Sequence, residues 1–139
     1  MSVIMPPDSR AAVTVALRTL LSGRSEPHAQ GATVGTRTRG QHQPGLPGLP
    51  YVLVASDGIQ PVRSGAAYTD LIRVTVWHQT EDEAFDLAVL SQGLLAEHRG
   101  GVLRGLRKTG SLLRALDEDT QTPMCSALLN AALLPSTTT

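Results

Sequence analysis

Apolar residues recur at helical spacing in two stretches of the chain. In the first, Val13, Leu17 and Leu21 follow the helix-start signal of residues 6–9 and precede Gly23. This pattern predicts an amphipathic helix of about four turns that begins at residue 8 or 9. Glycine is the usual residue just beyond a helix end, so we expect the helix to stop at Gly23.

The second helical stretch has the clearer start signal. Thr80 is followed three residues later by Glu83, which is the spacing of a capping box, and the acidic residues 81 and 82 suit the positive end of a helix dipole. Apolar residues then recur at helical spacing as far as His98, after which two glycines interrupt the pattern. We therefore expect a second helix between these two points.

Three stretches between the helices have strand patterns. Residues 33–39 alternate, with Arg and Thr on the outward face, and residues 51–55 form an apolar run that ends in the turn-forming residues 56–58. Residues 68–77 alternate most regularly and put aliphatic side chains on one face. The run Pro-Gly-Leu-Pro-Gly-Leu-Pro within residues 40–50 favours an extended loop, with a PxxP ligand as the alternative.

The last third of the chain is less regular. Residues 102–110 are basic and interrupted by glycines, residues 111–116 fit a strand, and residues 117–123 fit a polar turn. Residues 124–134 leave two alternatives open. Their Ala and Leu content favours a helix, whereas their position after a hairpin turn favours a strand.

The order of these elements predicts an α+β fold. We expect a mainly antiparallel sheet of about four to five strands with two helices packed on one face. A chain of 139 residues has the length of one domain, so a single domain would cover residues 8–134, with tails at residues 1–7 and 135–139. The other face of the sheet would then be solvated or covered by a partner.

Charge adds to this picture through its distribution. Twelve basic and twelve acidic side chains give a net charge of zero, which argues against a nucleic-acid or membrane-surface binder held by net charge. Residues 1–50 carry a net charge of +3, residues 51–98 carry −5, and residues 99–139 carry +2. Such segregation suits a head-to-tail ring, in which different patches of identical chains meet.

No motif predicts catalysis, a metal site or a cofactor site. Cys125 is the only cysteine, which excludes an intrachain disulfide and a Cys-rich zinc site. Neither His-Glu-x-x-His nor Gly-x-Ser-x-Gly occurs, and Gly100, Gly105 and Lys108 do not have the spacing of a phosphate-binding loop. Residues 117–120 lack the Gly and Glu of a calcium loop. We expect a protein that is not an enzyme and needs no cofactor.

The chain has no secretory or membrane-spanning pattern. Its first residues lack the charged start and apolar run of a signal peptide, and no stretch approaches the roughly 20 apolar residues of a membrane span. We therefore expect a soluble protein that stays where it is made.

A strand-to-helix motif covers residues 68–88. Its residues are Val74, Val76 and Trp77 in the strand, Thr80, Glu81, Glu83 and Ala84 in the cap, and Leu87 and Ala88 in the helix. This motif resembles the tail terminator, or tail completion, proteins of long-tailed bacteriophages, in which a Val-x-Val-Trp-like strand runs through a Thr/Asp-Glu-x-Ala cap into a long helix. In the order of elements, the resemblance extends over residues 8–134.

The resemblance implies a structural virion protein. It implies a homohexameric ring that caps the tail tube, stops tube polymerisation and offers a surface for head-tail joining. The implied partners are other copies of the chain, the major tail tube protein and the head-tail connector or neck protein, without a membrane. DNA would pass through the ring lumen without sequence-specific recognition. The implied location is the virion tail or neck, with assembly in the host cytoplasm, and the resemblance favours a strand over residues 124–134.

Two alternatives to a tail terminator remain open. One is another head-tail connector or neck joining protein of the same fold. The other, from a different class, is a small hydrolase or ligand-binding α+β domain with an unrecognised site.

Candidate interface residues of a ring lie on the polar strand, in the Pro/Gly loop and near the loop before the most regular strand. They are Arg37, Arg39, Leu46, Leu49, Arg63 and Asp70. For each of them, ordinary solvent-exposed surface is the alternative interpretation.

Overall fold

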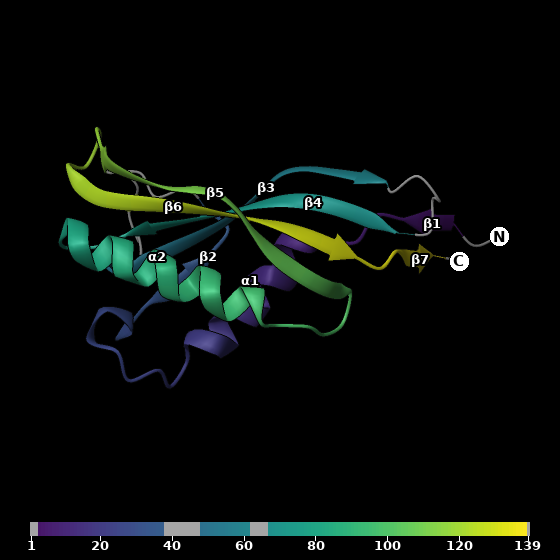
Figure 1. Cartoon of the computed structure of the whole chain (residues 1–139), viewed down its shortest axis with the longest axis horizontal. Coiled ribbons are helices and arrows are strands. Elements are labelled where there is room, and N and C mark those ends of the chain that lie inside the picture. The colour runs from purple at the N-terminus through teal and green to yellow at the C-terminus, as the bar shows by residue number, and fades with distance from the viewer. Residues whose placement is uncertain (1–2, 38–47, 62–66, 139) are drawn as a thin grey trace.

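The computed structural model describes residues 3–37, 48–61 and 67–138 as a two-layer α+β fold (Figure 1). One layer is a five-stranded sheet in the order β2-β3-β4-β6-β5, and α1 and α2 form the second layer on one face of it. This arrangement confirms the predicted fold class. In chain order the elements are β1 Val3–Met5, α1 Ser9–Leu21, the 3-10 turn η1 Pro27–Ala29, β2 Thr33–Gly35, β3 Tyr51–Pro61, β4 Tyr68–Trp77, α2 Glu81–Ala96, β5 Leu103–Asp117, β6 Thr122–Leu133 and β7 Ser136–Thr138.

Both helices begin where their capping residues predict. The Asp8 carboxylate accepts a hydrogen bond from the Ala11 backbone N–H at 3.0 Å, which satisfies one of the free donors at the start of α1. The Thr80 hydroxyl accepts from the Glu83 backbone N–H at 3.1 Å and so caps α2. The last helical residue of α2 is Ala96, two residues before the expected end.

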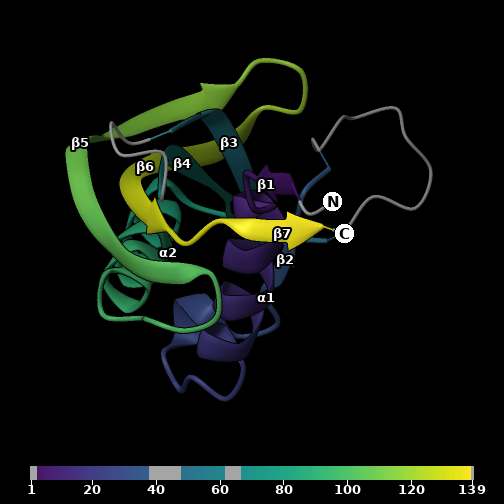
Figure 2. The same cartoon turned by 90° about the vertical axis from the view of Figure 1, so that its right-hand side faces the viewer.

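The sheet is antiparallel except for one pair among the described strands, β2 with β3, which is parallel. β4 occupies the centre, between β3 and β6, and its Ile72, Val74 and Val76 are fully buried beneath the helices. Figure 2 shows that β5 curves along the edge of the sheet toward α2. The aliphatic face predicted for residues 68–77 is therefore the core face of the central strand.

Residues 124–134 fall almost entirely within the strand β6. Every second side chain of β6 is buried, in the series Cys125, Ala127, Leu129, Ala131 and Leu133. β6 pairs with β4 on one side and β5 on the other, so backbone pairing in the middle of the sheet outweighs the helix propensity of Ala and Leu.

Two strands are longer than their local sequence predicts. β3 does not end at the turn-forming residues 56–58, because a register shift between Ser56 and Ile59 absorbs them. β5 likewise continues through its glycines, with a register shift between Thr109 and Leu113. Gly110 lies in this bulge at a φ of 65°, which is a conformation that glycine adopts without strain.

Other boundaries also differ from the sequence-based expectation. The strand expected over residues 33–39 is shorter, since only Thr33–Gly35 pairs with β3, and residues 38–47 lie outside the described part of the chain. The ends of the chain, expected to be unpaired tails, contain β1 and β7, which pair with each other in an antiparallel ladder. No helix in the described residues is both long and apolar enough to cross a membrane.

Candidate interaction surface

In the part of the chain that the structure describes, one face of the sheet carries no helix (Figure 1). We call it the open face. Leu53, Leu71 and Leu128 point to this side because they alternate with buried core residues, and they are half-buried. Arg73 also lies there and forms an ion pair with Asp57 at 2.9 Å. The open face thus mixes apolar and charged side chains.

Acidic side chains gather at one end of the molecule. Glu81, Asp82 and Glu83 form the first turn of α2, where carboxylates are stabilised by the helix dipole. Glu118 and Asp119 are exposed in the turn between β5 and β6, which lies at the same end, on the left of Figure 1. We call Glu118 and Asp119 the acidic tip.

Arg114 holds the hairpin of β5 and β6 against α2. Its guanidinium lies 3.4 Å from a Glu81 carboxylate oxygen and 3.9 Å from one of Asp82. The same group is placed 4.2 Å from the centre of the Phe85 ring, within the range of a cation–π contact. These contacts connect the acidic turn of α2 with the hairpin that carries the acidic tip.

The carboxylate of Asp117 shapes the acidic tip. It accepts hydrogen bonds from the Trp77 indole N–H at 2.8 Å and from the backbone N–H groups of Asp119 and Thr120 at 2.9 and 3.4 Å. Burial raises the pKa of Asp117, but these hydrogen bonds together outweigh burial and hold its pKa below the ordinary value of 3.8. The turn is therefore anchored, and its two exposed carboxylates project from a fixed base.

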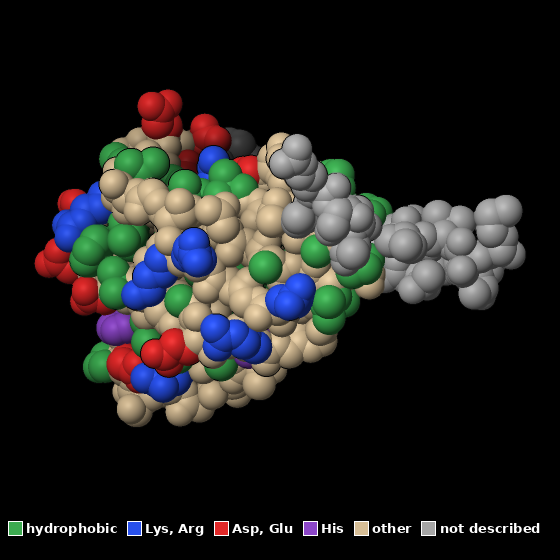
Figure 3. All heavy atoms as spheres, turned by 45° about the vertical axis from the view of Figure 1, so that its right-hand side comes forward, with side chains coloured by type: hydrophobic (Ala, Val, Ile, Leu, Met, Phe, Trp, Pro, Cys, Tyr) green, Lys and Arg blue, Asp and Glu red, His purple; other side chains and the backbone are tan. Residues whose placement is uncertain are grey.

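Basic side chains gather around the first half of β5. Arg99, Arg104, Arg107 and Lys108 are exposed and form no ion pair within the described residues. Figure 3 shows Lys and Arg side chains across the middle of one face, with most of the visible Asp and Glu toward its left side. Most of the visible acidic side chains thus lie to one side of these basic ones.

Two of these arginines border a hollow on the open face. Arg99 and Arg107 line it together with Thr69, Gly105 and Asn130, and its volume is about 340 Å³. The Arg99 side chain reaches this hollow beside Gly105. A Cβ atom added to Gly105 would lie 3.8 Å from Arg99 Nε. We call it the basic hollow. It combines two guanidinium groups, an amide and a hydroxyl, all of which donate hydrogen bonds.

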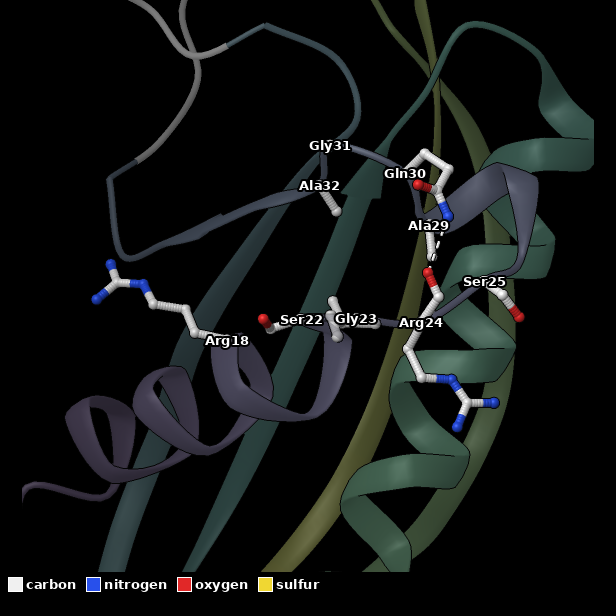
Figure 4. Close-up of a pocket in the computed structure, with 10 residues that line it drawn as sticks. Arg18, Ser22, Gly23, Arg24, Ser25, Ala29, Gln30, Gly31 and Ala32 are labelled. Atoms are coloured by element: carbon white, nitrogen blue, oxygen red, sulfur yellow. Dashed lines mark hydrogen bonds between the residues drawn. The ribbon is translucent and has the colours of Figure 1, made fainter.

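A second hollow lies where α1 ends (Figure 4). Its volume is about 640 Å³, and its polar groups are already engaged. Arg18 Nε donates to the Val34 carbonyl at 2.9 Å, Arg24 forms an ion pair with Glu26 at 2.8 Å, and the Gln30 amide donates to the Arg24 carbonyl at 2.8 Å. These internal bonds make it a weaker candidate for recognition than the basic hollow.

The structure corrects the prediction that Asp70 is an interface residue. Asp70 is only 2% exposed, because it lies on the core face of β4. Its carboxylate accepts hydrogen bonds from the hydroxyls of Ser9 and Ser56, the latter at 2.7 and 2.8 Å, and from the Gly58 backbone N–H at 3.3 Å. These donors replace water around the buried charge, so Asp70 joins the start of α1 to the sheet.

The other predicted interface residues are only partly described. Arg37 is exposed, and its backbone carbonyl accepts a hydrogen bond from the Tyr51 hydroxyl at 2.6 Å. Leu49 is half-buried and precedes β3 by two residues. Both therefore lie near the Tyr51 end of β3, whereas Asp70 pairs with Ile59 toward the opposite end. The remaining predicted residues, Arg39, Leu46 and Arg63, lie outside the described residues.

The local sequence predicts the segments of both charged regions but not their juxtaposition. The pattern of residues 81–83 predicts a helix cap, that of residues 117–120 a solvated turn, and that of residues 102–110 a basic segment. Only the pairing of β5 with β6 and the contact of Arg114 with α2 bring the first two together. The charge reversal from residues 117–119 to residues 99–108 along one strand is the sequence signal that points to them.

Two further titratable side chains, Cys125 and His78, are buried in the fold. Cys125 is fully buried, and burial raises the pKa of its thiol against the opposing effect of Arg114. His78 Nδ1 accepts from the Gln79 backbone N–H at 2.8 Å, which leaves Nε2 to donate to the His28 carbonyl at 2.8 Å. Within the described residues, no three His, Cys, Asp or Glu side chains are grouped so that they could hold a metal ion.

Comparison of the sequence with protein-family models and with curated proteins gives no match.

Proposed function

We propose that this protein is a tail terminator of a long-tailed bacteriophage, a structural subunit that forms a ring on the end of the tail tube. The ring stops tube polymerisation and provides the surface for head-tail joining. Its partners are other copies of the chain, the tail tube protein and a connector or neck protein. It acts by binding rather than by catalysis, first in the host cytoplasm and then in the virion.

The observation that carries this proposal is the separation of opposite charges on a neutral subunit. Glu81, Asp82 and the acidic tip lie at one end of the molecule, and the basic side chains surround the first half of β5. Unlike patches that complement each other generate head-to-tail contacts, and such contacts close into a ring when the rotation between subunits allows it. The strand-to-helix motif of residues 68–88 covers β4, the Thr80 cap and the first half of α2, in the order of the resembling family.

Deletion of the gene from the phage that encodes the protein tests its position in the tail. A tail terminator predicts overlong tubes without heads, seen by negative-stain electron microscopy. Tails of normal length that lack heads would instead assign the protein to another joining position in the neck. Unchanged virions would contradict both assignments.

A test with purified components measures capping directly. Wild-type protein added to polymerising tail tube protein should shorten the tubes, and electron microscopy should show it at one tube end only. Tubes of the same length with and without the protein would contradict the proposal.

A further inference from the structure

We infer that the acidic tip of one copy docks into the basic hollow of the next copy of this chain. This inference rests on the ring of the proposed function and specifies which surfaces of neighbouring subunits meet. It is carried by the geometry of the two regions, their complementary charge and the exposed apolar side chains that flank the tip.

The acidic tip is exposed on a turn that is anchored to the rest of the fold. Asp117 fixes the turn from inside through the Trp77 indole and two backbone N–H groups, so Glu118 and Asp119 are free to point outward. Arg114 anchors the hairpin to α2, which adds the carboxylates of Glu81 and Asp82 at the same end. Neither carboxylate of the tip forms an ion pair among the described residues.

The basic hollow has the donors that carboxylates bind. The guanidinium groups of Arg99 and Arg107 present pairs of parallel N–H donors, which match the two oxygens of a carboxylate. Asn130 and Thr69 add an amide and a hydroxyl, and Gly105 leaves room beside Arg99. The hollow thus offers two guanidinium groups that form no ion pair within the described residues, and their charge complements the two exposed carboxylates of the tip.

Apolar side chains near the tip favour a protein partner over a nucleic acid. Leu113 is 64% exposed and Leu116 is 52% exposed on the last residues of β5 before the turn. A second copy docked at the tip would cover part of this apolar surface, whereas a polyanion would be repelled by the carboxylates beside it. The net charge of zero likewise gives the chain no overall attraction for nucleic acid.

The two regions lie apart along the long axis, since the tip is at the left end of Figure 1 and β5 begins to the right of its centre. A contact between unlike patches leaves a free tip on one copy and a free hollow on the other. Each added copy therefore repeats the contact, and the assembly closes into a ring when the rotation between copies allows it. The contact between unlike patches thus predicts head-to-tail association rather than a two-fold dimer.

Paired charge reversal tests the docking. The hollow variant Arg99→Glu/Arg107→Glu and the tip variant Glu118→Lys/Asp119→Lys should each lose self-association by at least about tenfold in apparent Kd, because each then presents like charges at the contact. A 1:1 mixture should recover assembly, since each tip then meets a hollow of opposite charge. Sedimentation velocity measures the mass of each sample, and circular dichroism checks that each variant is folded.

A matched control separates the contact from total charge. Arg10→Glu/Arg24→Glu changes the net charge by the same amount at two exposed residues outside the hollow and outside the basic region of β5, and it should assemble like the wild type. A third variant, Leu113→Ser/Leu116→Ser, leaves every charge unchanged and should also weaken assembly.

Wild-type association should weaken with added salt, because the Debye length falls from about 30 Å at 0.01 M to about 3 Å at 1 M.

The outcomes separate this inference from the proposed function. Reversal variants that assemble like the wild type, or a mixture that does not recover assembly, would overturn the docking, while capping of tubes would leave the terminator function standing. A wild-type ring that depends on tip and hollow but caps no tube would support the docking and contradict the function. If the hollow variant loses only the binding of a short DNA duplex, the hollow is a nucleic-acid site and the inference is wrong.

Discussion

The indole N–H of Trp77 donates a hydrogen bond to the carboxylate of Asp117 at 2.8 Å, and this bond joins the last residue of β4 to the last residue of β5. The strand β6 lies between them, so the bond crosses the open face of the sheet. It fixes the base of the β5–β6 turn to the centre of the fold. The position of the acidic tip is therefore set by a side chain forty residues earlier in the chain.

Replacement of Trp77 by Phe should destabilise this end of the sheet. Phe keeps an aromatic ring beside Tyr51 but removes the N–H donor, and a hydrogen bond to a charged group contributes about 1.5–3 kcal/mol. We expect the free energy of unfolding in urea, followed by circular dichroism, to fall by an amount in this range. Tyr51→Phe is the comparison, because it removes the hydrogen bond from the Tyr51 hydroxyl to the Arg37 carbonyl and leaves both aromatic rings in place. An unchanged unfolding free energy for Trp77→Phe would show that the bond adds nothing to stability.

The same carboxylate makes stability depend on pH in the acidic range. The folded-state pKa of Asp117 is held below its ordinary value of 3.8, so the ionised form stabilises the folded protein. This contribution is fully present above the unfolded pKa and is lost as the pH falls through the lower folded pKa. We expect the unfolding free energy of the wild type to exceed that of Asp117→Asn at pH 6, and the difference to shrink below about pH 4. A difference that does not vary between pH 6 and 3 would contradict the assignment.

The buried cluster around Asp70 should be sensitive to substitution. Asp70→Ala leaves the hydroxyls of Ser9 and Ser56 without their acceptor, and an unsatisfied buried polar group costs about 1–3 kcal/mol. We expect a loss of about 2–4 kcal/mol in unfolding free energy for Asp70→Ala, since more than one donor is affected. Ser56→Ala removes one donor only and should cost less. Equal effects of the two substitutions would mean that the carboxylate is not the centre of the cluster.

Cys125 should resist thiol reagents in the folded protein. Its side chain is fully buried and burial raises its pKa, so little reactive thiolate is exposed. An aromatic disulfide reagent should release its chromophore slowly under native conditions and rapidly in concentrated denaturant. Rapid reaction of the native protein would show that the β4–β6 region opens more easily than its packing indicates.

Local sequence predicted the elements whose signals are local. The start of α1 at Asp8, the cap of α2 at Thr80 and the strand of residues 68–77 depend on neighbouring residues, and each is present as expected. The strand β6 is different, because its choice over a helix depends on pairing with β4 and β5. The turn signal at residues 56–58 was misleading for a related reason, since a bulge in β3 absorbs it.

Asp70 shows why the candidate site was harder to predict than the fold. In the alternation of residues 68–77, Asp70 falls on the same face as Ile72, but its position near the loop before this strand made it a candidate interface residue. The donors that stabilise it come from α1 and β3, at Ser9 and Ser56, and no pattern within β4 reveals them. The two charged regions are equally hard to predict from local sequence. The acidic end combines the start of α2 with the β5–β6 hairpin, and the basic hollow is lined by residues of three strands together with Arg99.

The pairing of β1 with β7 places both described ends of the chain side by side (Figure 2). Any domain or tag fused to either end would leave the subunit at the same place. In the proposed ring of identical subunits, additions at either end would emerge from the same side of every subunit. Labels attached at the two ends should therefore coincide in an image of the assembly and mark one position on each subunit.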